Sequence, residues 1–144
     1  RIRGRISPME AELADSQDNR NPLNSCMNVF KTFIFEAARS LPDLPDGHPC
    51  KNIHGHSFKI TITVTGSVDD RSGFVIDFGD IDEIFNPLLS KLDHSYLNDI
   101  EGLENPSSEN LCLWIWERLV PSLPGLSQIE IKETDSTGCI YKGE

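Results

Sequence analysis

The segment FKITITVTG, residues 58–66, constrains the fold more than any other stretch of this sequence. Its even-numbered positions are apolar up to Val64, and the positions between them carry lysine and threonine. Because successive side chains of a β-strand point to opposite faces, this period of two predicts a strand with one buried and one polar face. A chain with such a strand needs a sheet and a second layer that covers its apolar face.

Three further segments are predicted to form strands. VFKTFIF (29–35) is rich in aromatic and β-branched residues, and QIEIKET (128–134) alternates. GFVIDF (73–78) follows the turn-rich SVDDRS, so we expect it to form an antiparallel hairpin with residues 58–66.

Two segments have the spacing of apolar residues that is typical of helices. In IDEIFNPLLSKL (81–92), Pro87 must kink or interrupt the helix. In NPSSENLCLWIWERLV (105–120), Ser107 is the expected N-cap, and Pro121 is the expected stop. The chain is therefore predicted to adopt an α+β fold, in which two helices cover one face of an antiparallel four-stranded sheet.

The length and composition suit one domain. The chain has 144 residues, of which 38% are hydrophobic and 25% charged, as in an ordinary globular protein. Residues 1–27 are polar and lack a sustained period, so we expect a disordered tail, native or derived from cloning, before a single domain over 28–144.

The net charge of −10 argues against a nucleic-acid partner, because phosphate contacts need clustered lysine and arginine. An anionic substrate would need locally concentrated positive charge. No apolar run is long enough to cross a membrane, and the four cysteines form no CxxC pair. We expect a soluble, cytoplasmic protein that binds neither nucleic acid nor membrane.

His54 and His56 are the first candidates for chemistry. Both lie in phase with Phe58, so period two points both imidazoles toward the buried side, and Gly55 leaves room between them. Two such histidines can chelate one metal ion. The alternative is that they are polar residues at the strand entrance that bond to backbone groups, and for a pair so placed we favour the metal.

Cys50, Asp93 and His94 could form an acid–base set. A cysteine near an imidazole and a metal ion can have its pKa lowered enough to act as a base or nucleophile at neutral pH. Taken alone, each residue is better explained structurally, Cys50 as a small buried apolar residue and Asp93 as a turn former at a helix end.

Glu133 lies in phase with Ile129 and Ile131, so its carboxylate faces the side on which the isoleucines are buried. A buried charge needs a partner. Two carboxylate oxygens match an edge with two adjacent N–H donors, such as an arginine or the amino-pyrimidinone edge of a pterin or guanine. For an internal salt bridge, Arg39 is the obvious candidate.

Several short motifs together resemble a known family. They are FEAA-x-x-LP, C-x-x-x-HGH-S-F, GFVIDF, L-D-H-x-Y-L-N, NPSSEN and K-E-T…GCIYKGE. The chain resembles the 6-pyruvoyltetrahydropterin synthase superfamily from about residue 29 to the end. The three residues between Cys50 and His54, and the ending GCIYKGE, are most similar to the bacterial 6-carboxy-5,6,7,8-tetrahydropterin synthases of queuosine biosynthesis.

This resemblance implies a tunnelling fold, which trimerises into a β-barrel and stacks into a hexamer with active sites between subunits. It implies a lyase that converts 7,8-dihydroneopterin triphosphate to 6-carboxytetrahydropterin, acetaldehyde and triphosphate, with Zn²⁺ held by three histidines as the Lewis acid.

The resemblance also assigns roles to residues. Carried over by motif, Cys50 is the proton-abstracting base, and Asp93 and His94 are the relay that sets its protonation. Glu133 anchors the pterin ring, and Ser107 of NPSSEN belongs to the substrate site.

One position departs from the family. The first zinc ligand is the histidine of FEAAH, and here that position is Arg39. Guanidinium stays protonated and offers no lone pair, so it cannot ligate zinc.

Three interpretations stay open. His48 or Cys50 could complete a rearranged zinc site. No zinc could bind, with Arg39 paired to Glu133 or to substrate phosphate. The arginine could also be a variant in an otherwise ordinary enzyme. A scaffold subunit that co-assembles with an active paralogue, and a synthase with the pyruvoyl product, are the remaining alternatives.

Overall fold

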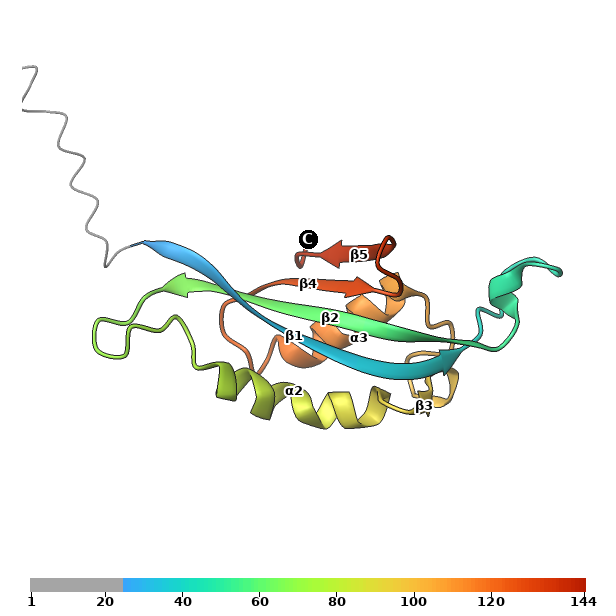
Figure 1. Cartoon of the computed structure of the whole chain (residues 1–144), viewed down its shortest axis with the longest axis horizontal. Coiled ribbons are helices and arrows are strands. Elements are labelled where there is room, and N and C mark those ends of the chain that lie inside the picture. The colour runs from blue at the N-terminus through green and yellow to red at the C-terminus, as the bar shows by residue number, and fades with distance from the viewer. Residues whose placement is uncertain (1–24) are drawn as a thin grey trace, which may run out of the picture.

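The computed structural model describes residues 25–144 as one five-stranded sheet and two helices (Figure 1). The strands are β1 (Cys26–Arg39), β2 (His54–Ser67), β3 (Ser95–Tyr96), β4 (Leu126–Lys132) and β5 (Gly138–Tyr141). The helices are α2 (Phe78–Leu92) and α3 (Ser108–Leu119), and η2 (Pro49–Lys51) and η3 (Leu97–Asp99) are short 3₁₀ turns. The strand order is β3-β1-β2-β4-β5. Of the tail expected over residues 1–27, residues 1–24 lie outside the described residues. Its last two residues belong to β1, which begins at Cys26.

The long β1–β2 hairpin positions the candidate site. Its two strands have 14 residues each and pair antiparallel along their whole length. β1 extends past the predicted 29–35, because buried and open positions continue to alternate up to its last residue. The register sets Ala37 opposite His56 and Arg39 opposite His54. The arginine is thereby fixed beside the histidine pair.

One face of the sheet and both helices share a single hydrophobic core. The inward positions of β1, β2 and β4 pack with the apolar faces of α2 and α3, as predicted. The largest fully buried side chains from these elements include Phe35, Phe58, Ile60, Ile81, Phe85, Leu111 and Ile115. The opposite face of the sheet exposes Phe30 and Ile34, with 62% and 64% of their surface open.

Pro87 lies inside α2 without ending it. The carbonyl left without its helical N–H partner is that of Glu83, and both Glu83 and Pro87 lie on the exposed face of the helix, which limits the cost of the proline. The predicted flaw is therefore accommodated within one helix.

The predicted strand over 73–78 is wrong. Residues 73–77 form a loop, and Phe78 begins α2 behind Asp77, whose carboxylate accepts the Gly79 N–H at 2.7 Å. Val75 and Ile76 pack against the core from this loop. These contacts with the core explain why the segment 73–78 is apolar without being a strand.

Three of the four predicted strands are present and two further strands were not predicted, so the sheet has five strands rather than four. β3 has two residues and pairs parallel with β1, and β5 has four residues and pairs antiparallel with β4. Tyr141 of β5 packs edge-on against Trp116 of α3, with ring centroids 5.1 Å apart. In the part of the chain that the structure describes, no helix is both long and apolar enough to cross a membrane.

Candidate active site

The end of the β1–β2 hairpin holds His54 in one orientation. Its Nδ1 lies 2.8 Å from the carbonyl oxygen of Asn52, and the Nε–H of Arg39 donates to its Nε2 at 3.4 Å. Because a carbonyl oxygen only accepts, Nδ1 carries the proton and Nε2 carries the lone pair. The lone pair that could bind a metal therefore faces a guanidinium.

Arg39 is buried, with 3% of its surface exposed, and it is surrounded by acceptors. Its Nη1 donates to the carbonyl oxygen of Pro106 and to Ser108 Oγ, both at 3.2 Å, and its Nη2 forms an ion pair with Glu133 Oε2. Ser108 Oγ donates to the same carboxylate oxygen at 3.0 Å. We call Arg39, His54, Ser108 and Glu133 the Arg39 cluster.

Contacts in the Arg39 cluster shift the pKa of Glu133 and of the neighbouring His56. Partial burial raises the pKa of Glu133, but hydrogen bonds from Arg39 and Ser108 outweigh it, so the pKa lies below its usual value. Burial, and then the nearby Arg39 charge, lower the pKa of His56 from its usual value. At neutral pH the site therefore contains the carboxylate of Glu133, the guanidinium of Arg39 and a neutral His56.

The ion pair that the sequence offered as the alternative interpretation of Glu133 is present, and its partner is Arg39. Ser107 is the N-cap of α3, as predicted, and its Oγ accepts the Asn110 N–H at 3.1 Å. The serine that enters the cluster is its neighbour Ser108, which the sequence reasoning missed. Its place in the first turn of the predicted helix could have indicated this role, because a small polar side chain there can point into the protein.

The residues present do not fit a zinc site with three ligands. The rings of His54 and His56 lie 5.1 Å apart and almost perpendicular. Within residues 25–144, no three histidine, cysteine or acidic side chains are grouped so as to hold a metal ion. His48, the possible substitute, instead caps η2 and accepts the Cys50 N–H at 3.1 Å. The structure brings neither His48 nor Cys50 to the histidine pair.

Asp93 and His94 form a separate pair at the end of α2. Asp93 Oδ1 lies 3.0 Å from His94 Nδ1 and accepts the Glu36 N–H at 2.9 Å. The Glu36 N–H, and then His94, lower the pKa of Asp93. His94 has a φ of 57°, and its N–H donates to the Glu36 carbonyl at 2.6 Å. These backbone bonds hold an ionised carboxylate against the imidazole.

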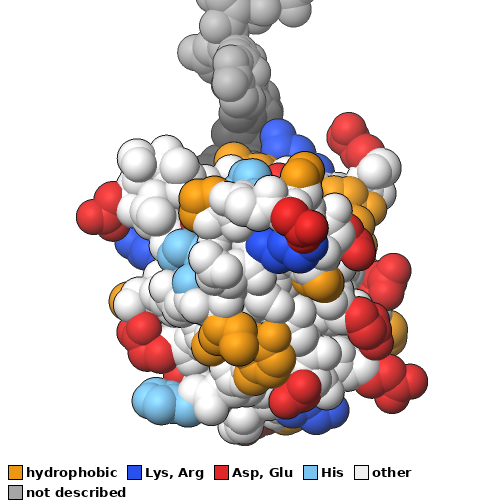
Figure 2. All heavy atoms as spheres, turned by 90° about the vertical axis from the view of Figure 1, so that its right-hand side faces the viewer, with side chains coloured by type: hydrophobic (Ala, Val, Ile, Leu, Met, Phe, Trp, Pro, Cys, Tyr) orange, Lys and Arg blue, Asp and Glu red, His pale blue; other side chains and the backbone are white. Residues whose placement is uncertain are grey.

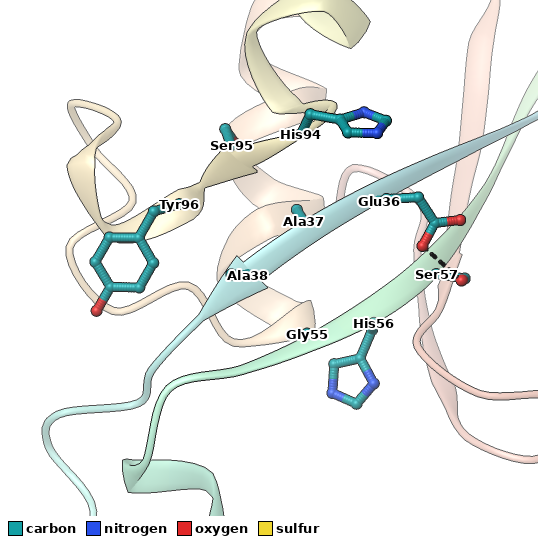
Figure 3. Close-up of a pocket in the computed structure, with 9 residues that line it drawn as sticks. All are labelled: Glu36, Ala37, Ala38, Gly55, His56, Ser57, His94, Ser95 and Tyr96. Carbon is teal, nitrogen blue, oxygen red and sulfur yellow. Dashed lines mark hydrogen bonds between the residues drawn. The ribbon is translucent and has the colours of Figure 1, made fainter.

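A cavity of about 560 Å³ lies between this pair and the hairpin (Figure 3). His94, Tyr96, Glu36 and His56 are among its lining residues. Figure 3 shows the rings of His94 and His56 on either side of the β1–β2 ribbon, pointing away from each other. Within one chain, the Asp93–His94 pair therefore does not meet the Arg39 cluster.

A second cavity, of about 390 Å³, lies where β4 ends beside β2. Glu133, His56, Lys59 and Lys132 line it. Its volume is in the range of small-molecule sites. A Cβ on Gly55, which also lines it, would lie 3.3 Å from the Ala37 carbonyl oxygen, so this position needs a small residue.

Cys50 lies on η2 and is half-buried. Among the described residues, no hydrogen bond joins its side chain to Asp93 or His94. Figure 2 shows the end of the molecule toward which the η2 loop projects, and histidine side chains reach its surface among hydrophobic ones. The predicted acid–base set is thus divided between two places on one chain.

Residues 28–144 match the family model described as 6-pyruvoyl tetrahydropterin synthase. The chain belongs to this family. The family consists of lyases, and the resemblance seen in the motifs is confirmed.

The relatives include both 6-carboxy- and 6-pyruvoyltetrahydropterin synthases. A 6-carboxy-5,6,7,8-tetrahydropterin synthase of Synechocystis is 38% identical over 119 residues, which are 78% of this chain and 91% of the relative. The human 6-pyruvoyl tetrahydrobiopterin synthase is 32% identical over 65% of this chain and 68% of its own. The structure of 6-pyruvoyl tetrahydropterin synthase from Caenorhabditis elegans superposes with a TM-score of 0.77 at 26% identity, covering 83% of this chain and 97% of its own.

Proposed function

We propose that this chain is a lyase of the 6-carboxy-5,6,7,8-tetrahydropterin synthase type, acting on 7,8-dihydroneopterin triphosphate in queuosine biosynthesis. The observation that carries the proposal is an ionised, half-buried Glu133 at the wall of a ligand-sized cavity. The similarity to the Synechocystis protein supports the carboxy product, acetaldehyde and triphosphate over the pyruvoyl product.

Glu133 is proposed to anchor the pterin. Arg39 and Ser108 both bond to its Oε2, and 27% of the side chain is open. Among the described residues, no hydrogen bond uses Oε1. This oxygen is available to an N–H of the amino-pyrimidinone edge, while the cluster holds the carboxylate in place.

Lys59 and Lys132 are proposed to bind the triphosphate. They are direct partners across β2 and β4, and both line the cavity of Glu133. Like charges directly opposite each other on a sheet are destabilising, and neither lysine belongs to an ion pair of the described residues. A triphosphate would neutralise both, in a chain whose net charge is otherwise −10.

Acid–base chemistry is proposed for Cys50 as the proton-abstracting base, with Asp93 and His94 as its relay. Since this pair is remote from the Arg39 cluster in one chain, we propose that a second copy completes the site in a homotrimer or homohexamer. The exposed Phe30 and Ile34 on the open face of the sheet support association into a β-barrel.

A second candidate is a relative that binds pterin without catalysis, or that serves as a scaffold. It is favoured by the ion pair that already occupies one oxygen of Glu133. No step of either candidate is assigned to a metal.

The test is incubation of the purified chain with 7,8-dihydroneopterin triphosphate, with acetaldehyde and the pterin product measured together. Acetaldehyde released over many turnovers supports the lyase. Pterin binding without any product supports the second candidate. A pyruvoyl product without acetaldehyde would show that the chain is a 6-pyruvoyltetrahydropterin synthase instead. A chain that binds no pterin contradicts both the lyase and the pterin-binding relative, and leaves the scaffold as the remaining candidate.

A further inference from the structure

We propose that Arg39 is the resident cation of this site, and that His54 and His56 hold no metal ion in the native chain. The inference deepens the proposed function and rests on it for the reaction, but the metal content can be measured without substrate. Three observations carry it.

The first observation is the use of both ring nitrogens of His54. Nδ1 donates to the Asn52 carbonyl, and Nε2 accepts from Arg39. A metal ion needs a free lone pair on the imidazole. For His54 to become a ligand, its bond with Arg39 would have to break, or the ring would have to turn and give up its bond with Asn52.

The second observation is that Arg39 cannot easily leave. Its donors are satisfied by Pro106 and Ser108 at the start of α3 and by Glu133 after β4. No buried side-chain nitrogen or oxygen of the described residues lacks a hydrogen-bond partner. Moving Arg39 would leave Glu133 without its counter-charge, so the guanidinium is held in place by partners far apart in the sequence.

The third observation is the charge balance. The single positive charge of Arg39 is matched by the carboxylate of Glu133, and the two histidines add no negative charge. A divalent ion beside this pair would meet a guanidinium rather than a third ligand. The site is thus already neutral and complete without a metal.

This arrangement changes what the site offers a ligand. A bound pterin meets one delocalised positive charge held by hydrogen bonds, instead of a metal with an open coordination position. Binding at Glu133 should therefore be insensitive to chelators. Because Arg39 stands where the family has its first zinc-ligand histidine, the single substitution Arg39→His should be enough to create a metal site.

The experiment measures zinc in the full-length chain after equilibration with Zn²⁺ and dialysis, together with the melting temperature with and without Zn²⁺. For the native chain we expect far less than about one zinc per chain and no shift in Tm. For Arg39→His we expect about one zinc per chain, a raised Tm, and binding at least about 100-fold tighter than in the native chain. Arg39→Gln is the matched control, because it removes the charge without supplying a ligand.

The proposal is overturned if the native chain retains about one zinc per chain and the His54→Asn variant loses it. This comparison does not depend on whether Arg39→His folds. Zinc that stays in His54→Asn is bound elsewhere and leaves the histidine pair metal-free, as proposed. A zinc-free chain that releases no acetaldehyde refutes the proposed lyase but not this inference.

Discussion

Arg39 and Glu133 form an ion pair although 94 residues separate them in the sequence. Arg39 is the last residue of β1, and Glu133 directly follows β4, with β2 between the two strands. The pair therefore spans β2 at the end where His54 begins that strand. The same ion pair therefore stabilises this end of the sheet and holds Glu133, the proposed pterin anchor, in place.

The first prediction concerns Glu133→Gln. The substitution leaves the buried Arg39 without a counter-charge, so we expect the free energy of unfolding to fall by about 1–3 kcal/mol, less than for a fully buried pair because Glu133 is partly open. Urea unfolding measures it. Glu130→Gln, on the preceding strand β4, is the control and should change stability by no more than about 0.5 kcal/mol. Equal losses in both variants would contradict the role of the pair.

The second prediction concerns pH. The folded-state pKa of Glu133 lies below the usual 4.5, so the unfolded chain takes up the proton first as pH falls. The stabilisation of the fold by ionised Glu133 is complete above the usual pKa of 4.5 and is lost as the pH falls through the lowered folded-state pKa. The stability difference between the native chain and Glu133→Gln should therefore shrink in thermal melts as the pH falls from above the usual pKa of 4.5 to well below it. A difference that stays constant over this range would show that ionisation of Glu133 plays no part.

Much of the fold could be predicted because its pattern is local. The alternation over 58–66 and the apolar spacing in 81–92 and 105–120 specify the elements and their buried faces. The segment 73–78 was wrongly predicted to be a strand because Val75 and Ile76 pack against the core from a loop, and apolar residues in a loop need follow no regular spacing. The short strands β3 and β5 carry too few residues to show one.

The site was predictable where it lies on strands. The alternation over 128–134 placed Glu133 on the buried side, and Arg39, the last residue of β1, lies on the same side in the structure, so the alternative of a salt bridge between them could be foreseen. His48 and Cys50 lie on the irregular connection between β1 and β2, whose path depends on loop hydrogen bonds such as that from the Leu41 N–H to the Cys50 carbonyl. Sequence spacing carries no information about such a path.

The third prediction concerns Asp93→Asn. An amide oxygen can still accept the Glu36 N–H, so we expect the fold to persist, while the variant loses the negative charge beside the His94 ring. Release of acetaldehyde should fall by about 10²–10⁴-fold with little change in pterin affinity. Asp99→Asn, on the exposed surface of η3, serves as the control. Unchanged turnover would remove Asp93 from the proposed relay.

The fourth prediction concerns the two lysines. If Lys59 and Lys132 bind the triphosphate, inorganic tripolyphosphate should bind the native chain, and each Lys→Gln substitution should weaken it by about tenfold. Calorimetry at two salt concentrations gives the measurement, since binding through exposed charges weakens as screening increases. Lys91→Gln, near the end of α2, removes the same charge away from the cavity. If Lys91→Gln weakens binding as much as the cavity variants do, the attraction is general to the surface, and the lysine pair is not a phosphate site.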